Sequence, residues 1–338
     1  MSRPVEHAAR APLALIGAGR IGRIHAGNAA AHPALALRYV IDPAGDAAAA
    51  LAGRYGATAT TLEHALADPT VAGVIVASPT DQHLAHCRQA AAAGKAIFCE
   101  KPVDLSVERA RAAAGALAQA RLFLGFNRRF DPSFRALRQK LQAGAIGNLE
   151  TLHIVSHDPA PPPVSYIKVS GGLFKDMTIH DFDMARWLLA EPIVEVYAMA
   201  ACLVDPAIGA ADDIDTAKVL LRTASGRMAL ISNSRRSGYG YDQRIEAFGS
   251  GGSVRIDNPT TTTVAVWSEE GATRAPFQNF FLERYAQAYR LEMDHFAAVL
   301  RGEEPAVGFA DGVRALELAE AAARSHATGR PVALSAAA

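Results

Sequence analysis

The chain has 338 residues, half of them hydrophobic and a fifth charged, which is enough for two domains that each have their own core. Basic and acidic residues both number 34, so the formal net charge is zero. This balance excludes the broad electrostatic surface with which proteins bind nucleic acid or anionic membranes.

The three cysteines, Cys87, Cys99 and Cys202, lack the spacing of metal ligands, and their odd number argues against a disulfide framework. The first eleven residues lack the apolar stretch of a signal peptide, and no apolar run reaches membrane-spanning length. We therefore expect a cytoplasmic chain with no resident metal and no membrane partner.

The first predicted element is a short buried strand, Leu13–Ile16, followed by glycines spaced as G-x-G-x-x-G. Gly17 permits the tight turn out of the strand, Gly19 leaves room for a pyrophosphate, and Gly22 lets the next helix pack closely. That helix, at about 21–31, directs free N–H groups at the phosphates. The alternative is a glycine-rich turn that binds no ligand.

The next apolar run, Leu37–Ile41, ends at Asp42, twenty positions beyond Gly22. A carboxylate at this place accepts hydrogen bonds from the ribose diol and repels a 2′-phosphate, so the sequence favours NAD over NADP. The alternative is that Asp42 caps a helix that begins after Pro43.

Short apolar runs continue to alternate with alanine-rich segments of helical length up to about residue 125. This pattern predicts a doubly wound parallel sheet, a Rossmann domain at residues 1–125, whose ligands bind at the carboxyl ends of the strands. The expected strands are Leu13–Ile16, Leu37–Ile41, Val71–Ala77, Ala96–Cys99 and Leu122–Leu124, with further helices at 44–55, 83–93 and 107–120.

Polar residues follow two of these strands. Residues 78–83 contain Ser78, Thr80 and His83, which either line the cofactor cleft or form a capping turn. Glu100 and Lys101 follow the next strand directly. A lysine beside a cofactor can donate to a substrate oxygen or exchange a proton with it, although an ordinary surface lysine is the alternative.

Beyond residue 125 the pattern becomes that of an α+β domain, which we place at residues 126–330. A helix at 132–141 and a strand at 149–155 precede a stiff loop, Pro159–Pro163. Several runs separated by turns then predict a large, mostly antiparallel open sheet with one uncovered face suited to oligomerisation. The expected strands are 194–204, 216–223, 228–232, 244–248, 253–256 and 262–267, and two helices, 280–301 and 310–328, follow them.

The stretch Gly171–Asp183 carries Asp176 and His180, four positions apart and so on one face of a helix. Histidine is suited to take a proton from an alcohol because its ordinary pKa lies near neutrality, and a neighbouring carboxylate fixes the ring and stabilises imidazolium. A lysine cation favours the developing alkoxide. The alternative is an ordinary surface pair.

These motifs, in this order over nearly the whole chain, resemble the family of glucose–fructose oxidoreductase, inositol dehydrogenase and the rhizopine-catabolism dehydrogenases. The most specific signal is Glu-Lys-Pro at 100–102 with Asp-x-x-x-His at 176–180. Within the family the chain looks most like inositol 2-dehydrogenases, on segments 126–131, 239–243 and 281–285. Some inositol dehydrogenases have methionine where Asn127 stands.

The resemblance implies NAD-dependent oxidation of a secondary alcohol of a cyclic polyol, myo-inositol or a stereoisomer, to the ketone by hydride transfer. His180 would take the hydroxyl proton, assisted by Asp176, and Lys101 would contact the nicotinamide side and the substrate hydroxyl. The family also implies a homo-oligomer, a dimer or a homotetramer. The implied substrate contacts are Asn127, Arg128 and Tyr239, and the implied cofactor contacts are Gly17, Gly19, Arg20, Ile21, Gly22, Asp42, Ser78, Thr80, His83, Glu100 and Lys101.

Three other functions compete with this interpretation. One is an NAD(P)-dependent dehydrogenase of an aldose or another sugar. A second is a redox-silent sensor that binds NAD, against which the joint presence of Lys101, Asp176 and His180 argues. A third is metal-assisted chemistry, although the sequence has none of the usual metal motifs. The side chains available to a metal would be His153, His157, Asp158, Asp176 and His180.

Overall fold

The computed structural model describes residues 10–335, which form two compact units. The first comprises the described residues up to Asn127 together with Tyr289–Val313, and the second comprises Arg128–Ala288 and the described residues from Arg314 onward. The sequence analysis placed all of 126–330 in the second domain. Residues 289–313 instead pack in the first unit, where Phe296 lies against Phe98 with ring centroids 5.8 Å apart.

The first unit is built on a six-stranded parallel sheet with the order β3-β2-β1-β4-β5-β6. This is the Rossmann strand order, which confirms the predicted fold class. The middle strands are almost wholly buried, as the unbroken apolar runs predicted. The strands are β1 (Ala11–Ile16), β2 (Leu35–Ile41), β3 (Thr58–Ala59), β4 (Gly73–Val76), β5 (Ala96–Glu100) and β6 (Leu122–Gly125).

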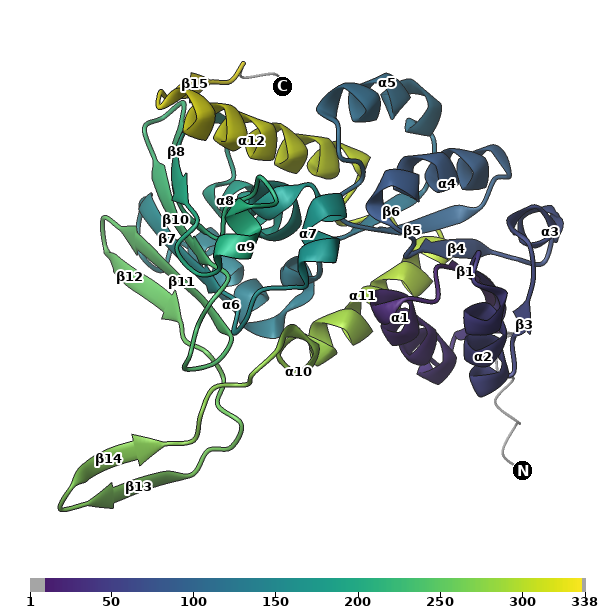
Figure 1. Cartoon of the computed structure of the whole chain (residues 1–338), viewed down its shortest axis with the longest axis horizontal. Coiled ribbons are helices and arrows are strands. Elements are labelled where there is room, and N and C mark those ends of the chain that lie inside the picture. The colour runs from purple at the N-terminus through teal and green to yellow at the C-terminus, as the bar shows by residue number, and fades with distance from the viewer. Residues whose placement is uncertain (1–9, 336–338) are drawn as a thin grey trace. The chain divides into compact units, whose positions relative to one another are not determined.

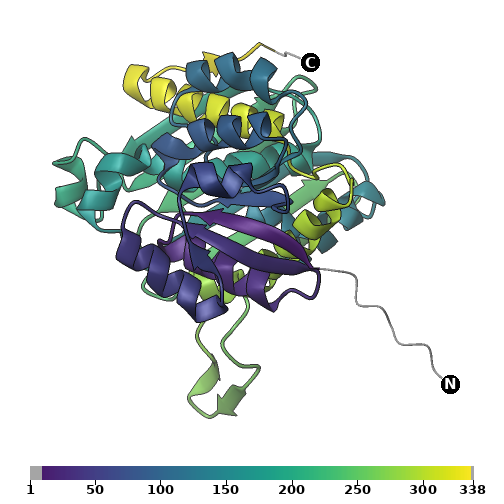
Figure 2. The same cartoon turned by 90° about the vertical axis from the view of Figure 1, so that its right-hand side faces the viewer.

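Helices cover both faces of this sheet, with α1 and α2 on one side and α4 and α5 on the other (Figure 1, Figure 2). Helix α4 begins three residues before the predicted start because Pro79 is its N-cap, so Thr80 is already helical. The short β3 and α3 lack an apolar pattern and were not predicted. The helices are α1 (Arg20–Ala31), α2 (Gly45–Tyr55), α3 (Leu62–Ala67), α4 (Thr80–Ala92), α5 (Val107–Leu117) and α11 (Ala286–Leu300).

The second unit is built on a seven-stranded sheet with the order β12-β11-β7-β10-β9-β8-β15. Only β7 and β10 pair in parallel, so the sheet is mostly antiparallel, as predicted. The strands are β7 (Leu149–His157), β8 (Ile193–Ala201), β9 (Thr216–Thr223), β10 (Met228–Ser234), β11 (Asp242–Gly249), β12 (Gly252–Ile256) and β15 (Val332–Ala333).

Two predicted elements of this unit take a different form. The strand expected at 262–267 does not join the sheet but forms a hairpin, β13 (Ala265–Ser268) with β14 (Gly271–Arg274), which extends away from it (Figure 1). The single helix expected at 280–301 is divided at Tyr285 into α10 and α11. The remaining helices are α6 (Pro132–Gln142), α7 (Val164–Ser170), α8 (Ile179–Leu189), α9 (Pro206–Gly209), α10 (Phe281–Arg284) and α12 (Phe309–Thr328), with a 3₁₀ turn η1 (Asn127–Phe130) and a π-helical turn η2 (Phe174–Thr178).

One face of the seven-stranded sheet carries exposed apolar side chains. Burial alternates along β9 and β11, so that one face of each strand is buried and the other exposed. The strand register places Met199, Leu220, Met228 and Phe248 on the same face, and all four are exposed. Within the described residues, this face therefore presents apolar surface to the surroundings.

Candidate active site

The glycine loop of the first unit leaves space for a ligand. Gly17 has φ +105°, and a Cβ there would lie 2.4 Å from the carbonyl oxygen of Ala77. A Cβ on Gly22 would lie 2.0 Å from the carbonyl oxygen of Gly17, so the fold itself requires both glycines. A Cβ on Gly19 would meet no atom within 4 Å, and no side chain caps α1 at this residue. The cradle therefore fits a pyrophosphate at the helix N-terminus.

Asp42 joins the glycine loop to the end of β2. Its Oδ2 accepts a hydrogen bond from the backbone N–H of Ala18 at 2.7 Å, and its Oδ1 accepts one from that of Ala44 at 2.8 Å. It does not cap α2, whose N-cap is Ala44 without any side-chain bond. Because a carboxylate oxygen has two lone pairs, both oxygens can still accept from ribose hydroxyls.

The turns after β4 and β5 hold the other cofactor candidates of the first unit. Ser78 Oγ and His86 Nδ1 share a hydrogen bond at 3.0 Å. Glu100 is nearly buried, and its Oε1 lies 2.5 Å from Nε2 of the fully buried His25. These turns follow neighbouring parallel strands, so they lie at the same edge of the sheet as the glycine loop. Of the remaining candidates, Arg20 and Ile21 lie in the first turn of α1, Thr80 and His83 in α4, and Lys101 directly after β5.

In the second unit, Asp176 and His180 lie on either side of a helical junction. Asp176 is in the π-helical turn η2 and His180 is in the first turn of α8. The sequence predicted one continuous α-helix here, whereas the structure inserts a wider turn of the kind often found at functional sites. The two residues are therefore one helical turn apart, although not with regular α-helical spacing.

The carboxylate of Asp176 is held by two groups from other elements. Its Oδ2 accepts hydrogen bonds from Nη1 and Nη2 of Arg235, both at 3.2 Å, and its Oδ1 accepts one from the hydroxyl of Tyr166 at 2.9 Å. Arg235 is only 1% exposed. The buried guanidinium and the phenol together fix the orientation of the carboxylate. The sequence analysis missed both partners.

A buried hydrogen-bond network anchors the start of α8 to the sheet. Asp181 accepts from Arg128 Nη1 at 2.5 Å and from Asn233 Nδ2 at 2.7 Å. Asn233 Oδ1 in turn accepts from Thr178 Oγ1 at 2.7 Å, and Arg128 Nη2 donates to Ser156 Oγ at 3.0 Å. These side chains come from η1, β7, β10 and the η2–α8 junction. The network therefore fixes the backbone that carries Asp176 and His180.

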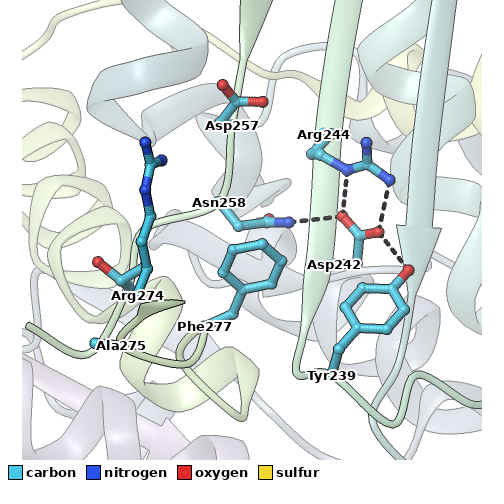
Figure 3. A pocket seen from close by; sticks show the side chains of 9 residues that line it. Tyr239, Asp242, Arg244, Asp257, Asn258, Arg274, Ala275 and Phe277 are labelled. Carbon is cyan, nitrogen blue, oxygen red and sulfur yellow. Dashed lines mark hydrogen bonds and ion pairs between the residues drawn. The ribbon is translucent and has the colours of Figure 1, made fainter. Parts of the chain in front are cut away.

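The three expected substrate contacts have different surroundings. Arg128 is part of the buried network just described. Asn127 belongs to the first unit and is buried, and within the described residues its Oδ1 has no hydrogen-bond donor, which leaves an acceptor for a ligand hydroxyl. Tyr239 is 54% exposed, and its hydroxyl donates to Asp242 Oδ2 at 2.8 Å (Figure 3).

Tyr239 lines a pocket of about 370 Å³ near the hairpin base, which neither Asp176 nor His180 lines. The close-up shows the phenol of Tyr239 next to the ring of Phe277 (Figure 3). The guanidinium of Arg244 is paired with the carboxylate of Asp242. The pocket is lined by Tyr239, Asp242, Arg244, Asp257, Asn258, Thr260, Arg274, Ala275 and Phe277.

Asp158, directly after β7, is a titratable group that the sequence analysis considered only as a metal ligand. Burial raises its pKa to about 7, with Arg235 opposing the shift and Asp176 adding to it. Its carboxyl therefore holds or releases a proton near neutral pH, close to the charged Asp176.

No three His, Cys, Asp or Glu side chains within residues 10–335 are arranged so that they could hold a metal ion. Over the same residues, every helix is too short or too polar to cross a membrane.

The glycine cradle predicts that two similar substitutions affect different properties, one the binding of NAD and the other the stability of the fold. Gly19→Ala should leave the thermal unfolding of the cofactor-free chain almost unchanged but weaken NAD binding about tenfold or more, because the methyl group occupies the path of the pyrophosphate. Gly22→Ala should instead destabilise the fold by about 1–3 kcal/mol through overpacking. Thermal melts and calorimetric NAD titration check both. Unchanged NAD affinity in Gly19→Ala would contradict the cradle.

The position of Asp158 predicts a stability difference that depends on pH. Its folded pKa of about 7 lies above the ordinary value of 3.8, so its contribution to stability is present at low pH and is lost as pH rises through 7. Asp158→Asn, which mimics the protonated acid, should therefore melt progressively higher than the wild type as pH rises from about 4 to about 7, and the difference should stay constant above that. Exposed Asp257→Asn is the control. A difference that stays constant with pH would show that Asp158 is not titrating there.

Both units match known protein families. A family profile described as "Oxidoreductase family, NAD-binding Rossmann fold" matches residues 12–127. A second, described as "GFO/IDH/MocA C-terminal domain", matches residues 134–255.

Among curated relatives, the inositol 2-dehydrogenase of Rhizobium meliloti (strain 1021) is 48% identical, over 95% of this chain and 98% of that protein. Among solved structures, a myo-inositol dehydrogenase from Corynebacterium glutamicum ATCC 13032 is similar with a TM-score of 0.92 and 44% identity, over 97% of this chain and 100% of that one. The scyllo-inositol dehydrogenase of Lactobacillus casei, solved with NAD(H) and scyllo-inositol, has a TM-score of 0.89 and 29% identity, covering 96% and 99% of the chains. The chain therefore belongs to the GFO/IDH/MocA family of oxidoreductases, and its first unit is an NAD-binding Rossmann fold.

Proposed function

We propose that the chain oxidises a secondary alcohol of a cyclic polyol, myo-inositol or a stereoisomer, to the ketone with NAD as the hydride acceptor. The observation that carries the proposal is the Asp176 carboxylate, held by Arg235 and Tyr166 one helical turn before His180. The names of the relatives, inositol 2-dehydrogenases and a scyllo-inositol dehydrogenase, support the substrate class.

The first unit would hold the cofactor through its main chain and a few side chains. The glycine loop and the N-terminus of α1 would bind the pyrophosphate, and Asp42 would accept from the ribose diol. Ser78, Thr80 and Glu100 would line the rest of the site. NAD, when bound, supplies the hydride acceptor. We accordingly assign the first unit, with residues 289–313, to cofactor binding and the second unit to substrate binding and oligomerisation.

Proton transfer and charge stabilisation would fall to three side chains. His180 would take the hydroxyl proton as hydride leaves the same carbon, and Asp176, held in place by Arg235, would stabilise the imidazolium that results. The Lys101 cation would lower the energy of the developing alkoxide. Asn127, Arg128 and Tyr239 would bind the other hydroxyls of the polyol.

The chain would act as a cytoplasmic homo-oligomer, in our proposal a homotetramer. Met199, Leu220, Met228 and Phe248, which are exposed on one face of the sheet, support assembly, because large apolar side chains left exposed on a domain are typical of an interface. The buried free thiols of Cys87 and Cys99 are compatible with a reducing compartment.

A substrate panel tests the reaction. With saturating NAD, myo-inositol and scyllo-inositol should give NADH, and Lys101→Ala should lower kcat about a hundredfold or more while NAD affinity changes little. Absorbance at the NADH band and calorimetric titration measure the two effects. Activity on glucose or galactose but on no inositol would favour the aldose dehydrogenase. No turnover of any polyol, with NAD still bound, would favour a sensor.

The assembly proposal predicts the mass in solution. The wild type should sediment at about four times the chain mass of 35.6 kDa. Phe248→Asp should shift it to smaller species, because a carboxylate buried in an apolar interface costs several kcal/mol. Sedimentation velocity measures the mass of the wild type and of the variant. A wild type that sediments as a monomer would contradict the proposal.

A further inference from the structure

His83 connects two turns of the first unit through both of its ring nitrogens. The residue lies near the start of α4 and is 2% exposed. Its Nδ1 lies 2.8 Å from the carbonyl oxygen of Pro102, and its Nε2 lies 2.9 Å from that of Ser78. Ser78 follows β4, and Pro102 follows Lys101 at the end of β5. One side chain therefore spans the two turns at the cofactor edge of the sheet.

The two contacts determine the charge of the ring. A carbonyl oxygen only accepts hydrogen bonds, whereas neutral imidazole has one N–H donor and one nitrogen lone pair. A neutral His83 would thus direct its lone pair at a carbonyl oxygen less than 3 Å away. An imidazolium has two N–H donors and satisfies both carbonyls. Only the protonated ring satisfies both contacts at once.

The groups around His83 act on its charge in both directions. The pKa of His83 is lowered from its ordinary value, with burial as the largest cause, although the carbonyls of Pro102 and Ser78 raise it. The charge of Glu100 also raises it, whereas Lys101 lowers it. The pKa of His86, one turn further along α4, is lowered by burial and by the charge of His83. Loss of the proton from His83 would leave one of the two carbonyl contacts as a repulsive contact inside the protein, and this opposes the effect of burial.

We propose that His83 is a positioning residue that, as a buried imidazolium, clamps the turn after β4 to the turn after β5 and so fixes Lys101. The sequence analysis placed His83 in direct contact with the cofactor. In the structure both ring nitrogens are occupied by the main chain, so the ring has no donor left for NAD. The effect on turnover rests on the proposed function, whereas the charge and the clamp do not.

Nitrogen NMR of the full-length chain tests the charge directly. In ¹⁵N-histidine-labelled protein at about pH 7.5, both ring nitrogens of His83 should be of the protonated type, with the exposed ring of His64 as the reference signal. Loss of the signals in His83→Gln assigns them. One unprotonated ring nitrogen at this pH would overturn the proposal whatever the enzyme's activity.

A pair of variants tests whether the clamp acts on Lys101. His83→Leu removes both donors, His83→Gln keeps an amide donor, and His64→Gln is the matched control in the same unit. The side-chain ¹³Cε signal of Lys101, assigned with Lys101→Ala, should shift in His83→Leu, shift less in His83→Gln and stay in place in the control. The proposal is wrong if a folded His83→Leu leaves this signal unmoved.

Turnover provides the functional measurement. His83→Leu should lower kcat about tenfold or more, with a smaller change in KM for NAD, and His83→Gln should recover part of the loss. An unchanged kcat in a folded His83→Leu would refute the positioning role. If the wild type oxidises no polyol, the proposed function fails, and the two NMR measurements still decide the charge and the clamp.

Discussion

The buried hydrogen bond between Arg128 and Asp181 is the interaction on which the second unit's candidate site depends. Because both groups are shielded from water, removing either one would leave an uncompensated buried charge, which costs on the order of 3–5 kcal/mol. Asn233 satisfies the other oxygen of Asp181 and also receives the hydroxyl of Thr178. Hydrogen bonds therefore tie the start of α8 to η1 and β10, and the π-helical turn with Asp176 directly precedes it.

The two units prepare their sites by different physical means. The first relies on backbone geometry, since glycines 17 and 22 are required by close backbone approach and a methyl group at Gly19 would enter open space. The second relies on buried polar side chains from separate strands, each with its partners in place. A backbone cradle suits a cofactor that is shared by many enzymes, and a side-chain network can vary with the substrate.

The sequence was sufficient to predict the features that depend on residues close together in the chain. The unbroken apolar runs predicted the parallel sheet, and the glycine spacing with Asp42 predicted the cofactor loop. It was not sufficient for partners that meet only in the folded chain, such as Arg235, which reaches Asp176 from 59 positions away. The π-helical turn has no distinct residue pattern, and the return of 289–313 to the first unit depends on packing, such as that of Phe296 on β5.

The central claim is that hydride passes from a ring carbon of the polyol to NAD. Incubating the enzyme with NAD and myo-inositol deuterated on every ring carbon tests this most directly, with the NADH product analysed by mass spectrometry and NMR. The account predicts one deuterium at C4 of the nicotinamide ring in every NADH formed. NADH without deuterium, or a ketone formed without any NADH, would contradict it.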